Sequence, residues 1–430
     1  MRTTLFCLVA SILMIQYVQA GTNQSKKINP KNTTIKDVLV LHPMYSVYHV
    51  SDTVTRVFFS ISSKELLYMK PSKTSDMMVA RGKIKFTLLP SYNSTLVIDS
   101  SSVYFVDTLS PGADQTMKIS GSFDVALSYS KVVVAELEFQ DINRGNDALT
   151  ILLLNKKTRQ TRQNFLVVGK SDKLPLTQNF ITSNDSVILT YNKDSVQKKL
   201  FVKYYLGEYL LPPPPFSYQE RKPFNFTPDS VFVVELDANY QVSMNFTKRG
   251  IYHFVTDTAS LEGYTMIRYT HSVPEFDDAQ EMLKSIRFIT TKQEHDELMS
   301  SDNLKLALDK YWLRCAQNNK DKARTLIKNY YTRIEKANTY FSSFDEGWKT
   351  DRGLVFLIFG SPQSVTRDNF SETWIYGDEK NTMRQVRFVY TKVENPFTDN
   401  DYILNRSESY KEIWFRNVDA WRMGRVLNEN

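Results

Sequence analysis

The sequence predicts a multidomain protein in which two antiparallel β-sandwich, immunoglobulin-like domains precede a helical hairpin and a small α+β module. Three observations lead to this prediction. The chain has 430 residues, enough for about two to four domains. Apolar residues alternate with polar ones from about residue 35 to 271, and the pattern then changes to a helical period. The 42% hydrophobic and 23% charged residues are ordinary globular values, which exclude wholesale disorder.

Charge and cysteine content exclude several classes of protein. The 54 basic and 47 acidic residues give a net charge of +7, a mild excess that does not predict a nucleic-acid binder. Two cysteines are too few for a disulfide scaffold or a cysteine-based zinc module. The sequence holds no P-loop, G-x-G-x-x-G, G-x-S-x-G or H-E-x-x-H motif. We therefore expect no cofactor, no metal ion and no catalytic residue of these types.

Residues 1–20 have the pattern of a cleavable signal peptide. A short basic segment precedes the apolar run 5–18, and the small residue Ala20 ends a typical cleavage site. Residues 21–34 are expected to form a flexible N-terminal segment. No later stretch has the ~18 apolar residues that a membrane span needs. The sequence thus predicts an exported protein with no transmembrane segment after cleavage.

Residues 35–172 are predicted to form the first β-sandwich. Ile84, Phe86 and Leu88 alternate with polar residues, as do the apolar residues of 135–139, which is typical of half-buried strands. Further strands are expected at 53–61, 95–106, 116–127, 149–154 and 164–168. Short strands at this spacing favour an antiparallel sandwich. The basic run 156–162 is expected to be an exposed hairpin tip.

Residues 173–271 are predicted to form the second β-sandwich. The boundary is expected near 170–180, because glycine, aspartate and proline in 169–175 interrupt the pattern. Strands are expected at 186–191, 199–206, 231–236, 241–246, 251–256 and 264–269. The four prolines Pro212 to Pro215 must be extended, because proline fixes φ and donates no hydrogen bond. They are either a stiff loop or a docking segment.

Residues 272–343 are predicted to form a helical hairpin. Thr291 and Glu294 have the spacing of a capping box, and apolar residues follow one helical face in 304–315 and again in 323–341. A polar turn between these two segments favours an antiparallel pair. Cys315 lies on the apolar stripe of the first helix. It is therefore expected to be a small core residue and not a nucleophile.

Residues 344–430 are predicted to form the α+β module. Strands are expected at 353–359, 372–376 and 385–393. Tyr410, Trp414, Val418 and Trp421 are spaced for a final amphipathic helix, and Gly424 is suited to end it.

The most specific motif opens this module. Residues 344–362 read FDEGWKTDRGLVFLIFGSP. This resembles the GWxTD domain, which is named for Gly347, Trp348, Thr350 and Asp351. The sequences WIY at 374–376 and WRMG at 421–424 fit the resemblance, which spans about 275–430. The resemblance implies an exported protein of a Gram-negative bacterium. It does not imply any enzymatic activity.

Two roles are open for the residues of the motif. Gly347 permits a tight turn, and Trp348 offers a large apolar face whose indole N–H needs a partner. Thr350 and Asp351 can cap backbone amides or orient Arg352. These properties favour fastening of a corner in the fold. The alternative is that Asp351 and Arg352 line a groove that binds a peptide or a glycan.

A tripeptide of aspartate, then serine or threonine, then a small or aliphatic residue recurs six times in the β-rich part of the chain. It is similar to the O-glycosylation acceptor sequence of exported proteins in the bacteria that carry GWxTD domains. Its acceptor residues would be Thr53, Thr108, Ser186, Ser195, Ser230 and Thr258. The other interpretation is that aspartate followed by serine or threonine favours turns and strand entries.

These observations favour a non-enzymatic, exported cell-envelope protein that acts as a scaffold or accessory subunit of a protein assembly. Its expected partners are envelope proteins, with an outer-membrane complex as one candidate, and its expected location is the periplasm or the cell surface. The alternative is a periplasmic hydrolase acting on glycan or peptide, with Asp351 as its candidate carboxylate. A secreted eukaryotic adhesion module, glycosylated at Asn-x-Ser/Thr sequons, is a third hypothesis. The resemblance and the single cysteine that would remain after cleavage argue against it.

Overall fold

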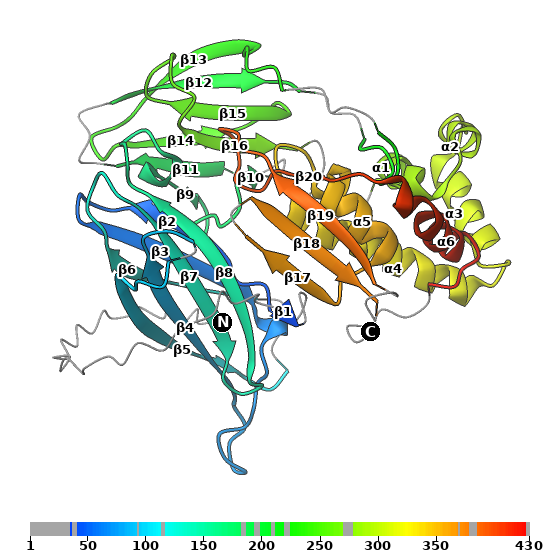
Figure 1. Ribbon diagram of the computed structural model, residues 1–430, viewed down its shortest axis with the longest axis horizontal. Coiled ribbons are helices and arrows are strands. Elements are labelled where there is room, and N and C mark those ends of the chain that lie inside the picture. The colour runs from blue at the N-terminus through cyan, green and yellow to red at the C-terminus, as the bar shows by residue number, and fades with distance from the viewer. Residues whose placement is uncertain are drawn as a thin grey trace, which may run out of the picture. The chain divides into compact units, whose positions relative to one another are not determined.

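The structure is a computed structural model, mostly of antiparallel sheets followed by helices (Figure 1). It describes residues 35–36, 41–92, 94–112, 117–181, 186–192, 198–207, 211–218, 224–269, 278–368, 370–377 and 385–426. None of the helices in this part of the chain is both long and apolar enough to cross a membrane.

The first part of the chain forms two antiparallel sheets that share one buried core. One sheet has the order β2-β3-β6 and the other β5-β4-β7-β8. The strands are β2 (Met44–His49), β3 (Val54–Ser62), β4 (Met78–Leu89), β5 (Asp99–Leu109), β6 (Lys118–Ala126), β7 (Val132–Asp141) and β8 (Asn146–Asn155). Val57 from one sheet and Ile84 and Phe139 from the other are fully buried in this core. The period-two pattern thus located all of these strands except β2 to within a few residues; β2 was not predicted.

A second pair of sheets follows, with the orders β14-β11-β9 and β10-β16-β15-β12-β13. All neighbouring strands are antiparallel except β10 and β16, which are parallel. The strands are β9 (Phe165–Gly169), β10 (Phe180–Ile181), β11 (Ser186–Tyr191), β12 (Lys199–Tyr205), β13 (Ser230–Glu235), β14 (Gln241–Asn245), β15 (Gly250–Val255) and β16 (Tyr264–Arg268). Because β9 pairs with β11, the boundary expected at 172/173 is too late. The chain changes sheets between β8 and β9.

The expectation of an exposed basic tip at 156–162 is wrong for Lys156, which is fully buried. Its Nζ donates hydrogen bonds to the carbonyl oxygens of Ser51 (2.6 Å) and Leu127 (2.8 Å), with that of Val54 at 3.3 Å. An ammonium group has three donors and can satisfy several carbonyls where strands end. Lys157, the next residue, is exposed as expected. Charge alone could not distinguish the two lysines.

The helical region contains α1 (Ala279–Ser285), α2 (Lys292–Met299), α3 (Leu304–Cys315) and α4 (Lys320–Phe341). The predicted capping box is confirmed: Thr291 Oγ1 accepts from Glu294 N (3.1 Å), and Glu294 Oε2 accepts from Thr291 N (2.9 Å). Cys315 is confirmed as a buried core residue. Because α3 packs against α1 as well as α4, the region is a cluster of helices and not an isolated hairpin.

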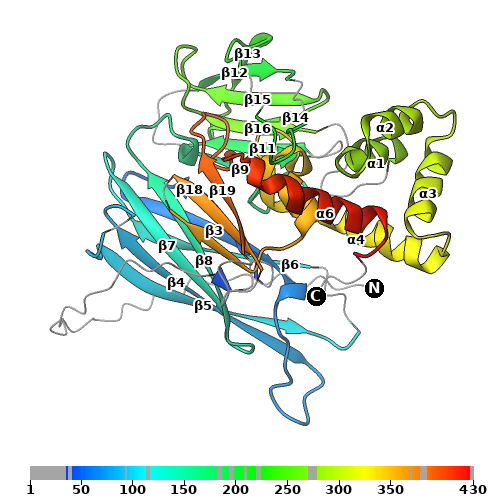
Figure 2. The same cartoon turned by 45° about the vertical axis from the view of Figure 1, so that its right-hand side comes forward.

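The C-terminal module combines helices α5 (Asp351–Phe359) and α6 (Lys411–Arg422) with a five-stranded antiparallel sheet. The sheet has the order β1-β17-β18-β19-β20, with β1 (Ile35–Lys36), β17 (Ser364–Arg367), β18 (Ser371–Tyr376), β19 (Val386–Lys392) and β20 (Tyr402–Leu404). Its helices lie beside the sheet in both views (Figures 1 and 2). The chain near residue 35 thus pairs with the last sheet and not with the first pair of sheets, as the domain prediction had it.

The prediction of a strand at 353–359 is wrong, because this segment is helix α5. The run from Leu354 to Ile358 is buried on every side, and periodicity cannot separate a fully buried strand from a fully buried helix. Local signals start and stop the helix. Thr350 Oγ1 accepts from Gly353 N (3.1 Å) as an N-cap, and Gly360 ends the helix with a φ of 78°.

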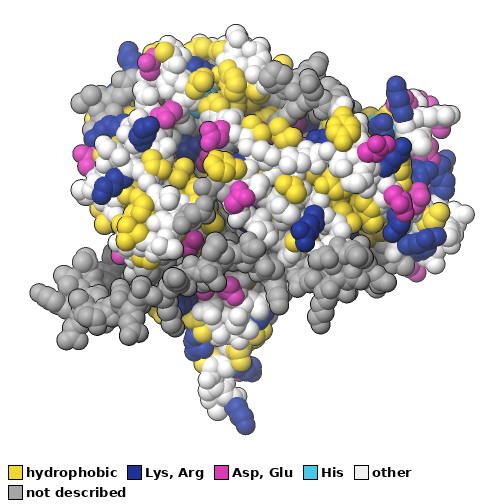
Figure 3. Space-filling view, in the orientation of Figure 1, with side chains coloured by type: hydrophobic (Ala, Val, Ile, Leu, Met, Phe, Trp, Pro, Cys, Tyr) yellow, Lys and Arg dark blue, Asp and Glu magenta, His cyan; other side chains and the backbone are white. Residues whose placement is uncertain are grey.

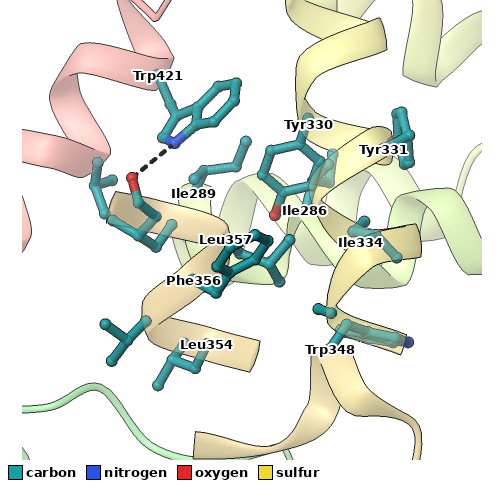
Figure 4. Close-up of a cluster of buried hydrophobic side chains, with 14 of the residues drawn as sticks. Ile286, Ile289, Tyr330, Tyr331, Ile334, Trp348, Leu354, Phe356, Leu357 and Trp421 are labelled. Atoms are coloured by element: carbon teal, nitrogen blue, oxygen red, sulfur yellow. Dashed lines mark hydrogen bonds between the residues drawn. The ribbon is translucent and has the colours of Figure 1, made fainter. Parts of the chain in front are cut away.

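One core joins these helices to the sheet. Figure 4 shows Tyr330 from α4, Phe356 from α5 and Trp421 from α6 pointing into it. Trp421 Nε1 donates to Ile358 O (3.2 Å), so the indole N–H is satisfied where it is buried. The aromatic stripes predicted for α4 and for the final helix α6 therefore form the interior of the module, and Gly424 follows with the expected positive φ of 62°.

Replacing Lys156 with methionine should destabilise the protein. The variant keeps the length of the side chain but leaves buried carbonyl oxygens without a donor, so the free energy of unfolding should fall by about 3 kcal/mol. The exposed Lys157→Met is the matched control and should change it by less than about 0.5 kcal/mol. Urea unfolding measures both, and equal stability of the two variants would contradict the assignment of Lys156.

Candidate functional site

The motif at 347–352 forms the corner between α4 and α5. Residues Gly347–Lys349 make a short 3-10 turn, η4, that lies directly on α4. A Cβ atom on Gly347 would overlap the carbonyl oxygen of Ala337 in α4, and one on Gly353 would overlap the carbonyl oxygen of Gly347. Both positions therefore need glycine, because three backbone segments touch there. The predicted close turn at Gly347 is confirmed, and its cause is backbone contact.

Trp348 is held by a carboxylate that the sequence did not single out. Its indole Nε1 donates to Glu346 Oε2 at 2.7 Å, and its backbone N–H donates to Asn338 Oδ1 at 3.2 Å. Lys349 Nζ lies 3.1 Å from Glu346 Oε1 and 5.2 Å from the Trp348 ring centroid. Glu346 is only 2% exposed. The indole thus has the partner that its burial requires, and Lys349 balances the charge.

Asp351 binds backbone and a cation from a distant part of the chain. Its Oδ2 accepts hydrogen bonds from Leu404 N (2.9 Å) and from Arg406 Nη1 (3.1 Å). Arg406 Nη2 also donates to the carbonyl of Pro213 (3.1 Å). One carboxylate in the first turn of α5 therefore fixes the end of β20 and, through Arg406, the polyproline segment, where a negative charge also suits the helix dipole.

Arg352 is also engaged within the fold. Its Nη2 donates to the backbone oxygen of Asn400 (2.9 Å), and its guanidinium lies 4.2 Å from the ring centroid of Tyr402. The Asn400 side chain donates in turn to Ser342 O (2.8 Å) at the end of α4. Arg352 is 3% exposed. The motif thus orders the segment before β20 as well as α5, which is the corner-fastening arrangement.

Glu372 on β18 completes this network of buried charges. It accepts from Arg367 Nε at 2.7 Å, lies 3.6 Å from Arg352 Nη1 and also accepts from Trp374 Nε1. Burial raises the pKa of Glu372, but the charges of Arg367 and Arg352 outweigh burial and hold the pKa below its usual value. Glu372 is therefore ionised and balanced at neutral pH.

A cavity of about 570 Å³ lies beside Arg352. Arg352, Glu372 and Tyr402 border it, and so does the stacked pair His42–Tyr340, with ring centroids 4.3 Å apart. Asp351 does not line it. The groove proposed for Asp351 and Arg352 is thus bordered by only one of them, through a guanidinium that already has partners.

Two of the three carboxylates around this cavity have pKa values shifted away from those of a general acid. The three carboxylates are Asp368, Glu372 and Asp399. Burial raises the pKa of Asp368. The hydrogen bonds that its carboxylate accepts from Ser371 and Phe370 N lower the pKa by more than burial raises it, so the net pKa is below its usual value. Asp399 Oδ2 lies 2.9 Å from Arg162. A general acid at neutral pH needs a raised pKa, and Asp368 and Glu372 are shifted the other way.

Asp345, just before the motif, is the carboxylate with the opposite shift. Burial raises its pKa from 3.8 to about 6. Its Oδ1 accepts from Glu346 N (2.8 Å), and its carbonyl oxygen accepts from Tyr269 Oη (3.1 Å). The space beside it is only about 10 Å³, roughly one water molecule, so this side chain does not face a substrate-sized cavity.

Two of the histidines are neutral core residues. The ring nitrogens of His49 contact Thr55 Oγ1 and Asn155 O, both at 2.9 Å, and burial lowers its pKa to about 4. His253 has the same arrangement with Thr265 and Leu261, and burial again lowers the pKa to about 4. Within the described residues, no three or more His, Cys, Asp or Glu side chains gather as a metal site would require.

The O-glycosylation candidates differ in accessibility. Thr53, Thr108, Ser230 and Thr258 are exposed, and Ser186 is half-buried. Ser195 lies outside the described residues. The neighbouring aspartates also have local roles: Asp257 Oδ1 accepts from Ala259 N (3.0 Å), and Asp107 Oδ2 accepts from Tyr68 Oη (2.6 Å). Both interpretations of the tripeptide therefore stay open.

Comparison with known proteins gives one informative match. Residues 250–423 match the family model described as the GWxTD domain. The match begins at β15, earlier than the start near 275 that the sequence predicted. No curated protein matches the chain. A crystal structure of red sea bream transglutaminase is similar at 9% identity and a TM-score of 0.18, over 54% of this chain and 32% of that chain. A similarity this weak carries no argument.

Asp345 should give the protein a measurable pH dependence. Because its pKa is about 6 in the folded state against 3.8 ordinarily, the folded state holds a proton in that window that the unfolded chain has released. The free energy of unfolding should therefore fall as the pH rises from about 4 to 6, by an amount on the order of 3 kcal/mol. Asp345→Asn should lack this fall and be more stable than the wild type at pH 7.

Urea unfolding at pH 4, 5, 6 and 7 measures this difference. The exposed Asp76→Asn is the control and should follow the wild type at every pH. An Asp345→Asn variant that is less stable than the wild type at pH 7 would contradict the raised pKa.

Proposed function

Because this chain belongs to the GWxTD domain-containing proteins, with the domain at residues 250–423, we propose that it is a non-enzymatic scaffold or accessory subunit of a protein assembly in the cell envelope. The signal-peptide pattern of residues 1–20 supports export, to the periplasm or the surface of a Gram-negative bacterium. An outer-membrane complex is the assembly we favour. The two pairs of sheets formed by β2–β8 and by β9–β16 would then be immunoglobulin-like modules that carry partner-binding surfaces.

The observation that carries this proposal is that the charged groups of the motif bind other parts of the fold. Asp351 is bound by Leu404 N and Arg406, and Arg352 by Asn400. Each contact joins elements far apart in the sequence, and each group is buried. Charged groups that hold a fold together in this way are not available to attack a substrate or to transfer a proton.

The hydrolase alternative has weaker support. The cavity beside Arg352 is large enough for a small ligand, which is the observation in its favour. Retaining and inverting glycoside hydrolases both need one protonated carboxyl group near neutral pH. Asp368 and Glu372, which line the cavity, have lowered pKa values, and Asp351 lies outside its lining.

Exposed apolar strands provide surfaces for protein partners. Val231, Phe232 and Val233 on β13 are 47%, 39% and 51% exposed, and β13 is an edge strand. Figure 3 shows apolar side chains grouped between charged ones on the visible face. Such groups on an exported protein are typical of interaction surfaces. The exposed Thr53, Thr108, Ser230 and Thr258 are proposed O-glycosylation sites, which intact-mass measurement of the native protein would detect.

Purification of the tagged full chain from its native host in mild detergent tests the proposal. The protein should elute with an envelope protein at a fixed stoichiometry, and the complex should sediment as one species. A folded Glu372→Gln variant distinguishes the hydrolase alternative from the scaffold proposal. A partner-free monomer that hydrolyses glycan or peptide substrates, and loses that activity in Glu372→Gln, would overturn the proposal.

A further inference from the structure

Strand β5 has one unpaired edge. It is 11 residues long and pairs only with β4, at the end of the order β5-β4-β7-β8. Its outer edge therefore presents a row of backbone N–H and C=O groups that could pair with another strand. In Figure 2, β5 forms the border of this sheet. No described strand of the chain pairs with that edge.

The centre of β5 lacks the usual protection of an edge strand. Residues 100–106 read SSSVYFV and contain no charged residue and no proline. Natural edge strands are usually shielded by such residues, by bulges or by a covering segment. Tyr104 and Val106 are 65% and 63% exposed, and the preceding Leu96, Val97 and Ile98 are 66%, 49% and 51% exposed. Among the described residues, the edge is thus both open and apolar.

A row of cations flanks this edge on the same face of the sheet. In the register of β4 with β5, Arg81 pairs with Val106, Lys83 with Tyr104 and Lys85 with Ser102. Lys83 Nζ lies 5.7 Å from the Tyr104 ring centroid. Within the described residues, none of these three cations has a carboxylate at ion-pair distance. On the other side of β4, Glu138 lies opposite Lys85 and Gln140 opposite Lys83, so Arg81 and Lys83 carry the positive charge without an acidic residue paired to them. A strand added beside β5 would lie about 4.8 Å beyond it and about 9.6 Å from β4, so a long acidic side chain such as glutamate could reach across β5 toward these long cationic side chains.

We propose that the edge of β5 binds an extended segment of a partner protein, with alternating apolar and acidic residues, as a fifth strand of this sheet. The inference rests on the proposed function, since it assigns the partner-binding surface of the scaffold. Backbone pairing would supply the hydrogen bonds. The acidic side chains of the added strand would share the face of Tyr104, Val106 and the cation row, and its apolar side chains would lie on the opposite face, beside Val103 and Phe105, which pack against the core.

A second copy of this chain suits the edge less well. Pairing of β5 with itself would place the serines of 100–102 near the cation row instead of carboxylates. It would also leave both rows of Arg81, Lys83 and Lys85 on one face of the joined sheet with no acidic strand between them. Charge complementarity therefore favours an acidic partner.

The second open edge, β13, provides a matched control. It also has exposed valines, but it has only 6 residues, and Lys199 on the neighbouring β12 is already 3.2 Å from Glu235. The same substitution can thus be made on two apolar edges, of which only β5 is predicted to bind an acidic strand.

The test uses the full chain and two nine-residue synthetic peptides, one alternating valine with glutamate and the other valine with lysine. Fluorescence anisotropy measures binding, and hydrogen exchange locates it. The valine–glutamate peptide should bind at least about tenfold more tightly than the valine–lysine peptide, because its carboxylates face the cation row. It should slow exchange of β5 amides and leave those of β13 unchanged.

Variants distinguish the edge from unspecific attraction. Val106→Asp should weaken binding of the valine–glutamate peptide by about tenfold or more, while Val233→Asp should change it by less than about twofold. The double variant Arg81→Glu, Lys83→Glu should reverse the preference to the valine–lysine peptide. Circular dichroism and thermal unfolding confirm that each variant is folded. The reversal keeps the test decisive even if Val106→Asp is unstable.

Several results would overturn the inference. They are equal binding of the two peptides, no binding, protection of β13 in place of β5, or self-association of the wild-type chain that Val106→Asp abolishes. Failure of the two proposals can be told apart. A native envelope partner that leaves β5 amides unprotected would refute the β5 site alone. Peptide binding at β5 by a protein with no native partner would refute the scaffold role alone.

Discussion

The C-terminal module depends on the carboxylate of Asp351. Its position at the first turn of α5 is set by the Thr350 cap, and from there it holds Leu404 N and Arg406. Both side chains are nearly buried, at 9% and 10% exposed. An ion pair at this depth is stable only if its hydrogen bonds are satisfied, and removal of one partner leaves an uncompensated charge. The corner between α4, α5 and β20 therefore depends on this ion pair for its stability.

The remaining motif residues extend the same constraint. Gly347 allows the 3-10 turn to rest on the α4 backbone, which places Trp348 over the core and Thr350 at the start of α5. Arg352 then reaches Asn400. Each residue thus fixes the position of the next, so the motif is explained by packing and hydrogen bonding. In the proposed function, this rigid module holds the sheets whose open edges contact partner proteins.

Local patterns allowed a substantial part of the fold to be predicted. Alternation located β4, β7 and most other strands, because one face of each is buried. The capping box at Thr291 and the glycine after α6 also depend only on neighbouring residues. The run 354–358 was misassigned as a strand because every residue in it is buried, and the signal that would have corrected this was Thr350, an N-cap candidate directly before the run.

The partners in the site could not be predicted in the same way. Arg406 lies 55 residues from Asp351, and Asn400 lies 48 residues from Arg352, so no local pattern joins them. Lys156 reads as one of several cations in a turn, although its ammonium group caps buried carbonyls. The role of Glu346 could have been predicted, because the indole N–H of Trp348 needs an acceptor and the carboxylate of Glu346 is only two residues away in the sequence.

A double-mutant cycle on Asp351 and Arg406 tests the central claim most directly. The free energies of unfolding of Asp351→Asn, Arg406→Gln and the double variant would be measured in urea at pH 7. If the motif fastens the fold, each single change should cost about 3 kcal/mol or more, and the double change little more than either one, a coupling of about 2 kcal/mol or more. An Asp351→Asn protein with wild-type stability and a lost hydrolytic activity would contradict the account.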